Sequence, residues 1–339
     1  MSIALDATYS LGRNLSGVGV YSRRLMFGLA GAHPEEDFLF CYRPHRFLRS
    51  YKDRIPRNAV RRLLTGTPPG DLFHALNQRV DARARRTLTT FHDLFVISGD
   101  YSSPEFRARF RQQAAAAAAR SDAIIAVSAF TAKQVEDLLK FPKERIRVVP
   151  HGVEIPAAGG AARGENLVLF VGAIQRRKNI ARLVKAFERM PAGWRLALAG
   201  APDGFGAGEE LHAVETSPRR ASIEVLGYVS AADLEALYRR ARIFAFPSLD
   251  EGFGMPVLDA MAYGVPVITS SRSALPEVAG EAALLVDPMN VEEIGDALQR
   301  LAEDETLRQD LIRRGRDRAR GFRWEAAVEA TWKIYHELK

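Results

Sequence analysis

Two carboxylates eight residues apart, Glu251 and Asp259, flank a glycine-rich turn. Proline is tolerated at the first positions of a helix, where its missing N–H would have no partner anyway, so we expect a helix to begin near Pro256. The free N–H groups at such a helix start attract phosphate. Glu251 would then lie in the loop and Asp259 about one turn into the helix, on either side of the anion.

This arrangement suits a sugar nucleotide, because N–H groups would meet its diphosphate and the two carboxylates would meet its hydroxyls. An ordinary strand-to-helix turn with surface carboxylates is the alternative that the spacing leaves open. The residues expected around the diphosphate are Gly252, Phe253, Gly254, Met255 and Pro256.

A basic turn, Arg176-Arg177-Lys178-Asn179, follows the apolar run 168–171. Asn179 is a good N-cap for the helix expected after it, which places Arg177 and Lys178 at the start of that helix. Fixed cations and oriented N–H groups would stabilise diphosphate charge without a metal ion. An exposed basic turn is the alternative.

Two further places follow expected strands, and open parallel sheets bind ligands beyond the carboxyl ends of their strands. His92 could hydrogen-bond a sugar hydroxyl there, with a purely structural histidine as the alternative. Gly17 and Gly19 would let the backbone approach a ligand. They do not complete the dinucleotide-binding pattern, and an ordinary turn without a ligand is an equally good interpretation. His151 is interpreted as a turn residue.

These residues need a scaffold, and apolar runs alternate with helical patterns along the chain, which indicates parallel sheets covered by helices on both faces. Small residues without periodicity between Pro156 and Glu165 predict a linker, so two doubly wound α/β domains fit better than one sheet. Expected strands cover 3–7, 37–42, 72–75, 87–91, 123–127 and 146–149, then 167–171, 195–199, 223–226, 243–246, 266–268 and 283–285. Expected helices cover 17–31, 104–120, 129–139, 180–190, 231–240, 256–263, 291–302 and, with aromatic residues on one face, the tail 322–338.

Composition limits the class of protein. With 339 residues, 47% hydrophobic and 26% charged, the chain is typical of globular proteins, and no apolar run approaches the length of a membrane helix. The N-terminus lacks signal-peptide features, so we expect a cytoplasmic location. Cys41 is the single cysteine, which excludes an intrachain disulfide and a cysteine metal cluster. No Asp-x-Asp motif occurs and the histidines are scattered, so no metal site is expected.

The net charge of +7 is uneven, with +9 on residues 1–165 and −2 on residues 166–339. Basic residues gather in segments 43–62 and 83–86. Such a patch could rest against anionic lipid headgroups at the inner face of a membrane or receive an acidic acceptor. No nucleic-acid motif accompanies the charge, so nucleic acid is not an expected partner. A solvated basic surface is the alternative.

Taken together, these motifs resemble those of the retaining glycosyltransferases of family 4. The segment from Glu251 to Asp259 resembles the family's E-x7-E signature, with aspartate as the second acid. Segment 177–179 resembles its R-K-N motif, and His92 matches its strand-end histidine. Residues 15–21, 226–230 and 264–268 also match, and the resemblance is strongest from 168 to 290.

The resemblance implies the GT-B fold, with two facing Rossmann-like doubly wound domains and a cleft between them. Residues 1–155 would form the acceptor-binding domain and 156–166 the linker. Residues 167–320 would bind the nucleotide sugar, and the helix in 321–339 would cross back to the first domain.

The resemblance also implies retaining, metal-independent transfer of a hexose from a nucleoside diphosphate sugar, the co-substrate, to a saccharide or lipid-linked acceptor, with no further cofactor. GDP-mannose is the first expectation for the donor and UDP-sugars the second. No covalent nucleophile stands out, which agrees with a front-face mechanism in which the leaving diphosphate takes the acceptor's proton. A nucleotide-sugar 2-epimerase and a non-catalytic sugar-nucleotide-binding protein remain open.

Individual roles follow from the same resemblance. Glu251 would lie at the donor sugar and His92 in the cleft as the catalytic pair, and Asp259 would receive the ribose hydroxyls. Arg177 and Lys178 would grip the diphosphate. The residues near the base would be Gly227, Tyr228 and Val229, and those of the glycine loop Gly17 and Gly19.

Overall fold

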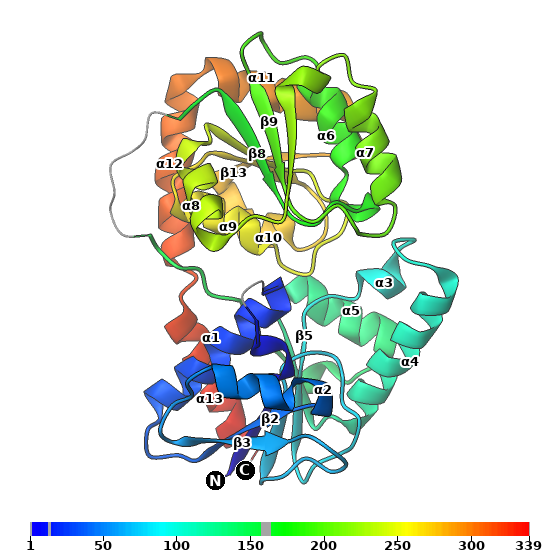
Figure 1. Cartoon of the computed structure of the whole chain (residues 1–339), viewed down its shortest axis with the longest axis vertical. Coiled ribbons are helices and arrows are strands. Elements are labelled where there is room, and N and C mark those ends of the chain that lie inside the picture. Colours follow the sequence, from blue (N-terminus) through cyan, green and yellow to red (C-terminus); the bar gives the residue numbers. More distant parts are fainter. Residues whose placement is uncertain (1, 13–14, 157–163, 339) are drawn as a thin grey trace. The chain divides into compact units, whose positions relative to one another are not determined.

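The computed structural model describes residues 2–12, 15–156 and 164–338, which form two compact α/β units (Figure 1). The first unit comprises Met1–Gly152 and Arg323–Lys339, and the second comprises Val153–Phe322. Residues 157–163 of the expected linker lie outside the described residues.

The first unit is built on a seven-stranded parallel sheet in the order β3-β2-β1-β4-β5-β6-β7. The chain builds outward from β1 in one direction and then, from β4, in the other, which is the doubly wound pattern. The strands are β1 (Ile3–Asp6), β2 (Phe38–Tyr42), β3 (Ala59–Leu63), β4 (Leu72–Ala75), β5 (Thr87–Phe91), β6 (Ala123–Ala126) and β7 (Ile146–Val148).

Both faces of this sheet are covered, because successive strand residues point to opposite sides. Ile3 and Leu5 belong to one buried apolar cluster and Ala4, between them, to another. The first cluster takes its helical side chains from α1 and α13, and the second from α3, α4 and α5. The helices are α1 (Gly17–Ala32), α2 (Pro44–Phe47), α3 (Phe95–Ser98), α4 (Pro104–Arg120), α5 (Ala129–Leu139) and α13 (Trp324–Glu337), with short 3-10 turns η1 (Ala7–Ser10), η2 (Leu48–Lys52) and η3 (Lys143–Arg145).

The last helix, α13, is part of the first unit's core. It packs along α1, where Gly28 allows a close approach: a Cβ at that position would lie 2.6 Å from Cγ2 of Val328. Tyr335 is fully buried in the same cluster, and the ring of Trp332 stacks on His33 at 3.7 Å between centroids. Residues far apart in the sequence therefore share one hydrophobic core.

The second unit contains a six-stranded parallel sheet in the order β10-β9-β8-β11-β12-β13, with the same doubly wound reversal between β8 and β11. Among its helices α6 contacts α7 and α11, whereas α9 contacts α10 and α12. The strands are β8 (Leu167–Val171), β9 (Arg195–Ala199), β10 (Ile223–Gly227), β11 (Ile243–Phe246), β12 (Val267–Ser270) and β13 (Ala283–Val286). The helices are α6 (Ile180–Phe187), α7 (Ala207–Glu215), α8 (Ala231–Arg240), α9 (Met255–Ala262), α10 (Leu275–Ala279), α11 (Val291–Glu303) and α12 (Glu305–Arg320), with 3-10 turns η4 (Arg176–Lys178), η5 (Arg220–Ser222) and η6 (Gly280–Ala282).

The sequence did not predict strand β3, the long helix α12, helix α7 or the short helices α2, α3 and α10. Arg61 and Arg62 make β3 look like a charged loop, but an edge strand is paired on one side only and tolerates charge well. Helix α12 is dominated by charged residues, so its apolar periodicity is weak.

Candidate functional site

The centre of the candidate site lies where β8 and β11 end, at the point where the second sheet reverses its winding. Lys178 closes the turn η4 after β8, and Glu251 follows β11. The Lys178 Nζ lies 2.5 Å from Oε1 of Glu251, and Arg177 Nη1 lies 2.8 Å from Oε2. All three side chains are about nine-tenths buried.

Neighbouring groups fix these two cations in place. The Lys178 Nζ lies over the ring of Phe246, 4.5 Å from its centroid, which is a cation–π contact. Arg177 Nη1 also donates to the carbonyl of Asp250 at 2.8 Å, and the amide of Leu249 donates to the carbonyl of Arg177 at 2.7 Å. The turn after β8 is thereby tied to the loop after β11.

The carboxylate of Glu251 is ionised at neutral pH. Burial raises its pKa, but Arg177 and Lys178 outweigh burial and lower it to about 2. Two cations therefore face one carboxylate, and side chains of this kind form charge-assisted hydrogen bonds with phosphate groups.

The loop that follows has a fixed shape. Ser273 Oγ accepts from the amide of Glu251 at 3.1 Å, and the amide of Ala274 donates to the carbonyl of Glu251 at 3.2 Å. Gly254 adopts φ 111°, and a Cβ there would lie 2.6 Å from Leu275, so only glycine fits. Helix α9 begins at Met255, directly after this glycine.

Of the residues expected around the diphosphate, Gly252 and Phe253 are buried, whereas Met255 and Pro256 are half-buried at the start of α9. Asp259, the second acid of the motif, is half-buried on the same helix. Burial, with a smaller contribution from Glu154, raises the pKa of its carboxyl to about 7. This acid consequently changes charge near neutral pH, unlike Glu251.

Asn179 occupies the N-cap position of α6, as expected. Its backbone adopts the left-handed conformation, φ 63°, and its side chain makes no cap hydrogen bond. The Nδ2 group donates instead to the carbonyls of Pro247 and Pro288, at 2.9 and 2.7 Å. Asn179 thus ties the turn that carries Lys178 to two other loops.

The residues expected near the base lie at the end of β10. Gly227 ends that strand with φ 65°, and its carbonyl accepts from the amide of Gly200 at 2.8 Å. Tyr228 is 53% exposed, which leaves its ring available to a ligand, and Val229 is half-buried.

In the first unit His92 directly follows β5 and is buried. Its Nε2 lies 2.9 Å from the carbonyl of Leu76, so Nε2 carries the proton. Burial lowers the pKa of His92 to about 4, against the opposing effect of the Leu76 hydrogen bond. His92 is therefore a neutral imidazole whose Nδ1 is an acceptor.

The interpretation of His151 as a turn residue is wrong. Its ring is buried and stacks on His92, with 5.4 Å between centroids and 20° between the planes. Tyr21 meets the ring of His151 at 4.9 Å and that of His92 at 4.7 Å, in both cases edge to face. The sequence offered no signal that these three rings meet.

Gly17 and Gly19 form the first turn of α1, whose N-cap is Ser16. The Ser16 Oγ accepts from the amide of Gly19 at 3.3 Å. Gly19 is buried, and a Cβ there would lie 2.9 Å from the carbonyl oxygen of Tyr9. Glycine is needed at this position for packing, and Gly17 is exposed.

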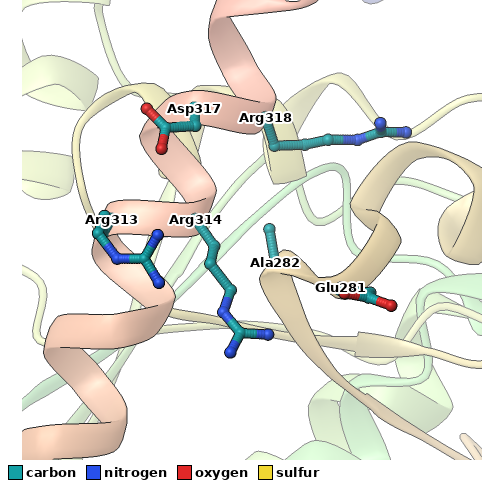
Figure 2. A pocket seen from close by; sticks show the side chains of 6 residues that line it. All are labelled: Glu281, Ala282, Arg313, Arg314, Asp317 and Arg318. Carbon is teal, nitrogen blue, oxygen red and sulfur yellow. The ribbon is translucent and has the colours of Figure 1, made fainter.

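A pocket of about 420 Å³ lies between α12 and η6 in the second unit (Figure 2). Its arginines already have partners: Arg313 and Arg314 pair with Asp310, and Arg318 donates to the carbonyls of Glu277 and Val278. The pocket shares no residue with the candidate site.

Within the described ranges, no helix is long and apolar enough to cross a membrane. In the same part of the chain, no three His, Cys, Asp or Glu side chains are grouped as metal ligands would be.

Two family models match almost the whole chain between them. Residues 9–155 match "Glycosyltransferase Family 4", and residues 154–318 match "Glycosyl transferases group 1". The O-antigen chain mannosyltransferase B of Escherichia coli is 31% identical over 307 residues, which are 86% of this chain and 76% of that protein. A D-inositol 3-phosphate glycosyltransferase of Saccharomonospora viridis is 30% identical over 277 residues, 74% of this chain and 63% of that protein.

Solved structures share the fold at lower identity. Sucrose-phosphate synthase from Thermosynechococcus elongatus aligns with a TM-score of 0.79 at 22% identity, covering 100% of this chain and 99% of that one. Anabaena HepE in complex with UDP-glucose aligns with a TM-score of 0.75 at 16% identity, covering 99% of each chain.

Proposed function

The chain belongs to glycosyltransferase family 4 and has the GT-B fold, and from this premise we propose that it is a retaining, metal-independent hexosyltransferase. The family and the fold class expected from the sequence are confirmed. The proposed donor is a nucleoside diphosphate sugar, and the proposed acceptor is a saccharide or a lipid-linked saccharide.

One observation carries this proposal: Lys178 and Arg177 converge on Glu251 at the reversal point of the second sheet. The two buried cations of that cluster support diphosphate binding next to the start of α9. Asp259, about one turn further along α9, is proposed to accept hydrogen bonds from the ribose diol. Gly227, Tyr228 and Val229, at the end of β10, are proposed to lie near the base.

In the proposed reaction the bond between the anomeric carbon and the diphosphate oxygen breaks. The acceptor oxygen bonds to the same face of that carbon, and its proton passes to the departing diphosphate. Lys178 and Arg177 stabilise the negative charge that develops on the leaving group. Glu251, released from its ion pairs as the diphosphate takes them over, would accept a hydroxyl of the donor sugar, and Nδ1 of His92 would accept another.

A mannosyl donor is favoured because relatives include mannosyltransferases. GDP-mannose is the first candidate. UDP-sugars are the second, since Anabaena HepE was solved in complex with UDP-glucose. Thermal unfolding against a panel of nucleotide sugars tests the donor, since a ligand that binds only the folded state raises Tm. Incubating the stabilising donor with and without acceptors then separates transfer from 2-epimerisation or from binding alone. Recovery of an epimer without any acceptor would contradict the proposal.

Donor affinity is expected to rise with pH between about 6 and 8. The pKa of Asp259, about 7, means that its carboxyl is largely protonated at the lower pH and ionised at the higher one, where it accepts both ribose hydroxyls. The raised pKa also means that the unfolding free energy falls as pH rises from about 4 to 7, because the folded state holds the proton more tightly than the unfolded chain. Calorimetric titration with the intact donor, whose diphosphate diester does not titrate there, measures the affinity. Asp259→Asn should give a flat profile, and an equally steep profile in this variant would remove the assignment.

Peripheral contact with an anionic membrane is proposed for the basic surface of the first unit. Leu48 and Tyr51 are 80% and 63% exposed on η2, and the guanidinium of Arg61 lies 4.9 Å from the ring centroid of Tyr51. Apolar side chains among cations match the interface of an anionic bilayer. The exposed basic residues around them are Arg49, Lys52, Arg54, Arg57 and Arg62.

Leu48→Ser should weaken binding to phosphatidylserine vesicles by about tenfold in a sedimentation assay, because one leucine side chain leaves the interface. Leu285→Ser is the control, since Leu285 is 40% exposed in the second unit. Equal losses of vesicle binding in the two variants would contradict membrane contact through this surface. Vesicle binding that does not weaken when salt is added would contradict it as well.

A further inference from the structure

A chain of buried hydrogen bonds runs from the C-terminal helix to the first helix of the first unit. Tyr335 of α13 bonds through its hydroxyl to Nδ1 of His74 at 2.7 Å. The Nε2 of His74 lies 2.8 Å from Oγ1 of Thr90, which lies 2.9 Å from the hydroxyl of Tyr21. All four side chains have no exposed surface.

The direction of these hydrogen bonds depends on which nitrogen of His74 carries the proton. Burial, with a smaller effect of His92, lowers the pKa of His74 to about 3, so its ring is neutral and carries one N–H. When Nε2 holds the proton, Tyr335 donates to His74 and His74 donates to Thr90. When Nδ1 holds it, Tyr21 donates to Thr90, Thr90 to His74 and His74 to Tyr335. Each bond therefore depends on the others, as in cooperative networks.

The far end of this set of hydrogen bonds reaches His92. The ring of Tyr21 lies edge to face against His92, with 4.7 Å between centroids and 80° between planes. His151 stacks on His92 and also meets the ring of Tyr21. The position of the Tyr21 ring therefore limits the orientations that both imidazoles can adopt. Thr90 fixes the Tyr21 hydroxyl, and Thr90 itself lies two residues before His92 on the same strand end.

We propose that Tyr335, His74, Thr90 and Tyr21 form a positioning chain that holds the imidazole of His92 in the orientation its reaction requires. The C-terminal helix thereby contributes to the donor-sugar end of the site without touching substrate. This inference rests on the role of His92 in the proposed function. If these side chains served packing alone, apolar side chains of the same shape would be sufficient. The continuous hydrogen bonds between hydroxyl and imidazole groups would not be needed.

Thr90→Val tests the proposal because valine keeps the shape of threonine and removes both hydrogen bonds of the central hydroxyl. We expect kcat to fall about tenfold with the donor KM nearly unchanged, since misorientation of a group that acts on the bound donor affects turnover. Thr90→Ser restores the hydroxyl and should recover most of kcat. Tyr335→Phe breaks the chain at its other end and should give a smaller loss of the same kind.

Thr89→Val is the matched control. Thr89 is the preceding residue of β5, fully buried, and its hydroxyl bonds to Ser121 Oγ at 2.7 Å outside the chain. Both valine variants remove a buried hydroxyl from the same strand, so both should lower Tm. Only Thr90→Val should lower the kcat of the folded enzyme.

Two measurements show whether the chain acts through His92. In the His92→Ala background, Thr90→Val should cause no further loss, because coupled residues are not additive. The imidazole ¹⁵N shifts of His92 should move in Thr90→Val and Tyr335→Phe and stay in place in Thr89→Val. Additive losses or unmoved His92 signals would overturn the positioning chain while leaving the transferase proposal intact. Wild-type turnover in His92→Ala would overturn both the chain and the proposed role of His92.

Discussion

Replacing Lys178 by alanine is expected to lower kcat/KM for sugar transfer by about 10²- to 10³-fold, the loss usually seen when one fixed stabiliser of transition-state charge is removed. The ammonium group is buried, held over Phe246 and directed at Glu251, so neither water nor a neighbour can replace it at the same point. Arg177 stays behind and carries part of the charge, which leaves a residual rate. Initial-rate measurements with saturating and limiting donor separate the loss in kcat from the loss in binding.

Lys185→Ala is the control for this prediction. Lys185 lies in the following helix α6, is 66% exposed and pairs with Glu188 at 2.7 Å. Its removal should leave kcat/KM within about twofold of the wild type, as expected for an exposed ion pair. Wild-type transfer by Lys178→Ala would show that the diphosphate is bound elsewhere.

Glu251→Gln is expected to abolish most transfer and at the same time to tighten binding of the free nucleoside diphosphate. The carboxylate occupies the two cations that are proposed to bind the diphosphate, so the diphosphate would have to displace it. Without that competitor, affinity for the diphosphate should rise by about tenfold, in the range of one charge-assisted hydrogen bond. Transfer should fall because the donor sugar loses the carboxylate that is proposed to accept a hydrogen bond from one of its hydroxyls.

The stability of the same variant gives a second readout. Glutamine leaves Lys178 and Arg177 buried with less compensation, and breaking a buried pair in this way costs about 3–5 kcal/mol. The ligand-free Tm should therefore fall, and the rise in Tm on adding the diphosphate should exceed that of the wild type. Glu209→Gln, at an exposed glutamate that pairs with Arg176, should change neither value. An unchanged diphosphate affinity in Glu251→Gln would show that the two anions do not share the cations.

Most strands could be predicted from the sequence because each is a short apolar run that ends at a glycine, proline or polar residue. The pairing of Lys178 with Glu251 could not be predicted in the same way. The two residues are 73 positions apart, and they meet only because β8 and β11 are neighbours in the sheet. The family motifs identified both residues. The ion pair between them, however, follows from the order of the strands in the sheet.

Local patterns were insufficient where a residue type has several common uses. Asn179 is the N-cap residue that its position before a helix predicts, but its side-chain amide joins the loops at Pro247 and Pro288 instead of capping the helix. Histidine beside proline and glycine is typical of a turn, yet His151 is enclosed by Tyr21, His92 and Trp324. In each case the deciding partners come from distant parts of the chain, which local patterns do not report.

Helix α13 supplies side chains to the same hydrophobic cluster as β1 and α1, although the whole second unit lies between them in the sequence. The first unit is thus an interrupted domain, and the second is inserted within it. During synthesis from the N-terminus, the ribosome delivers every residue of the inserted unit before the piece that closes the core of the outer one. The unit that starts first is consequently the last that can be completed.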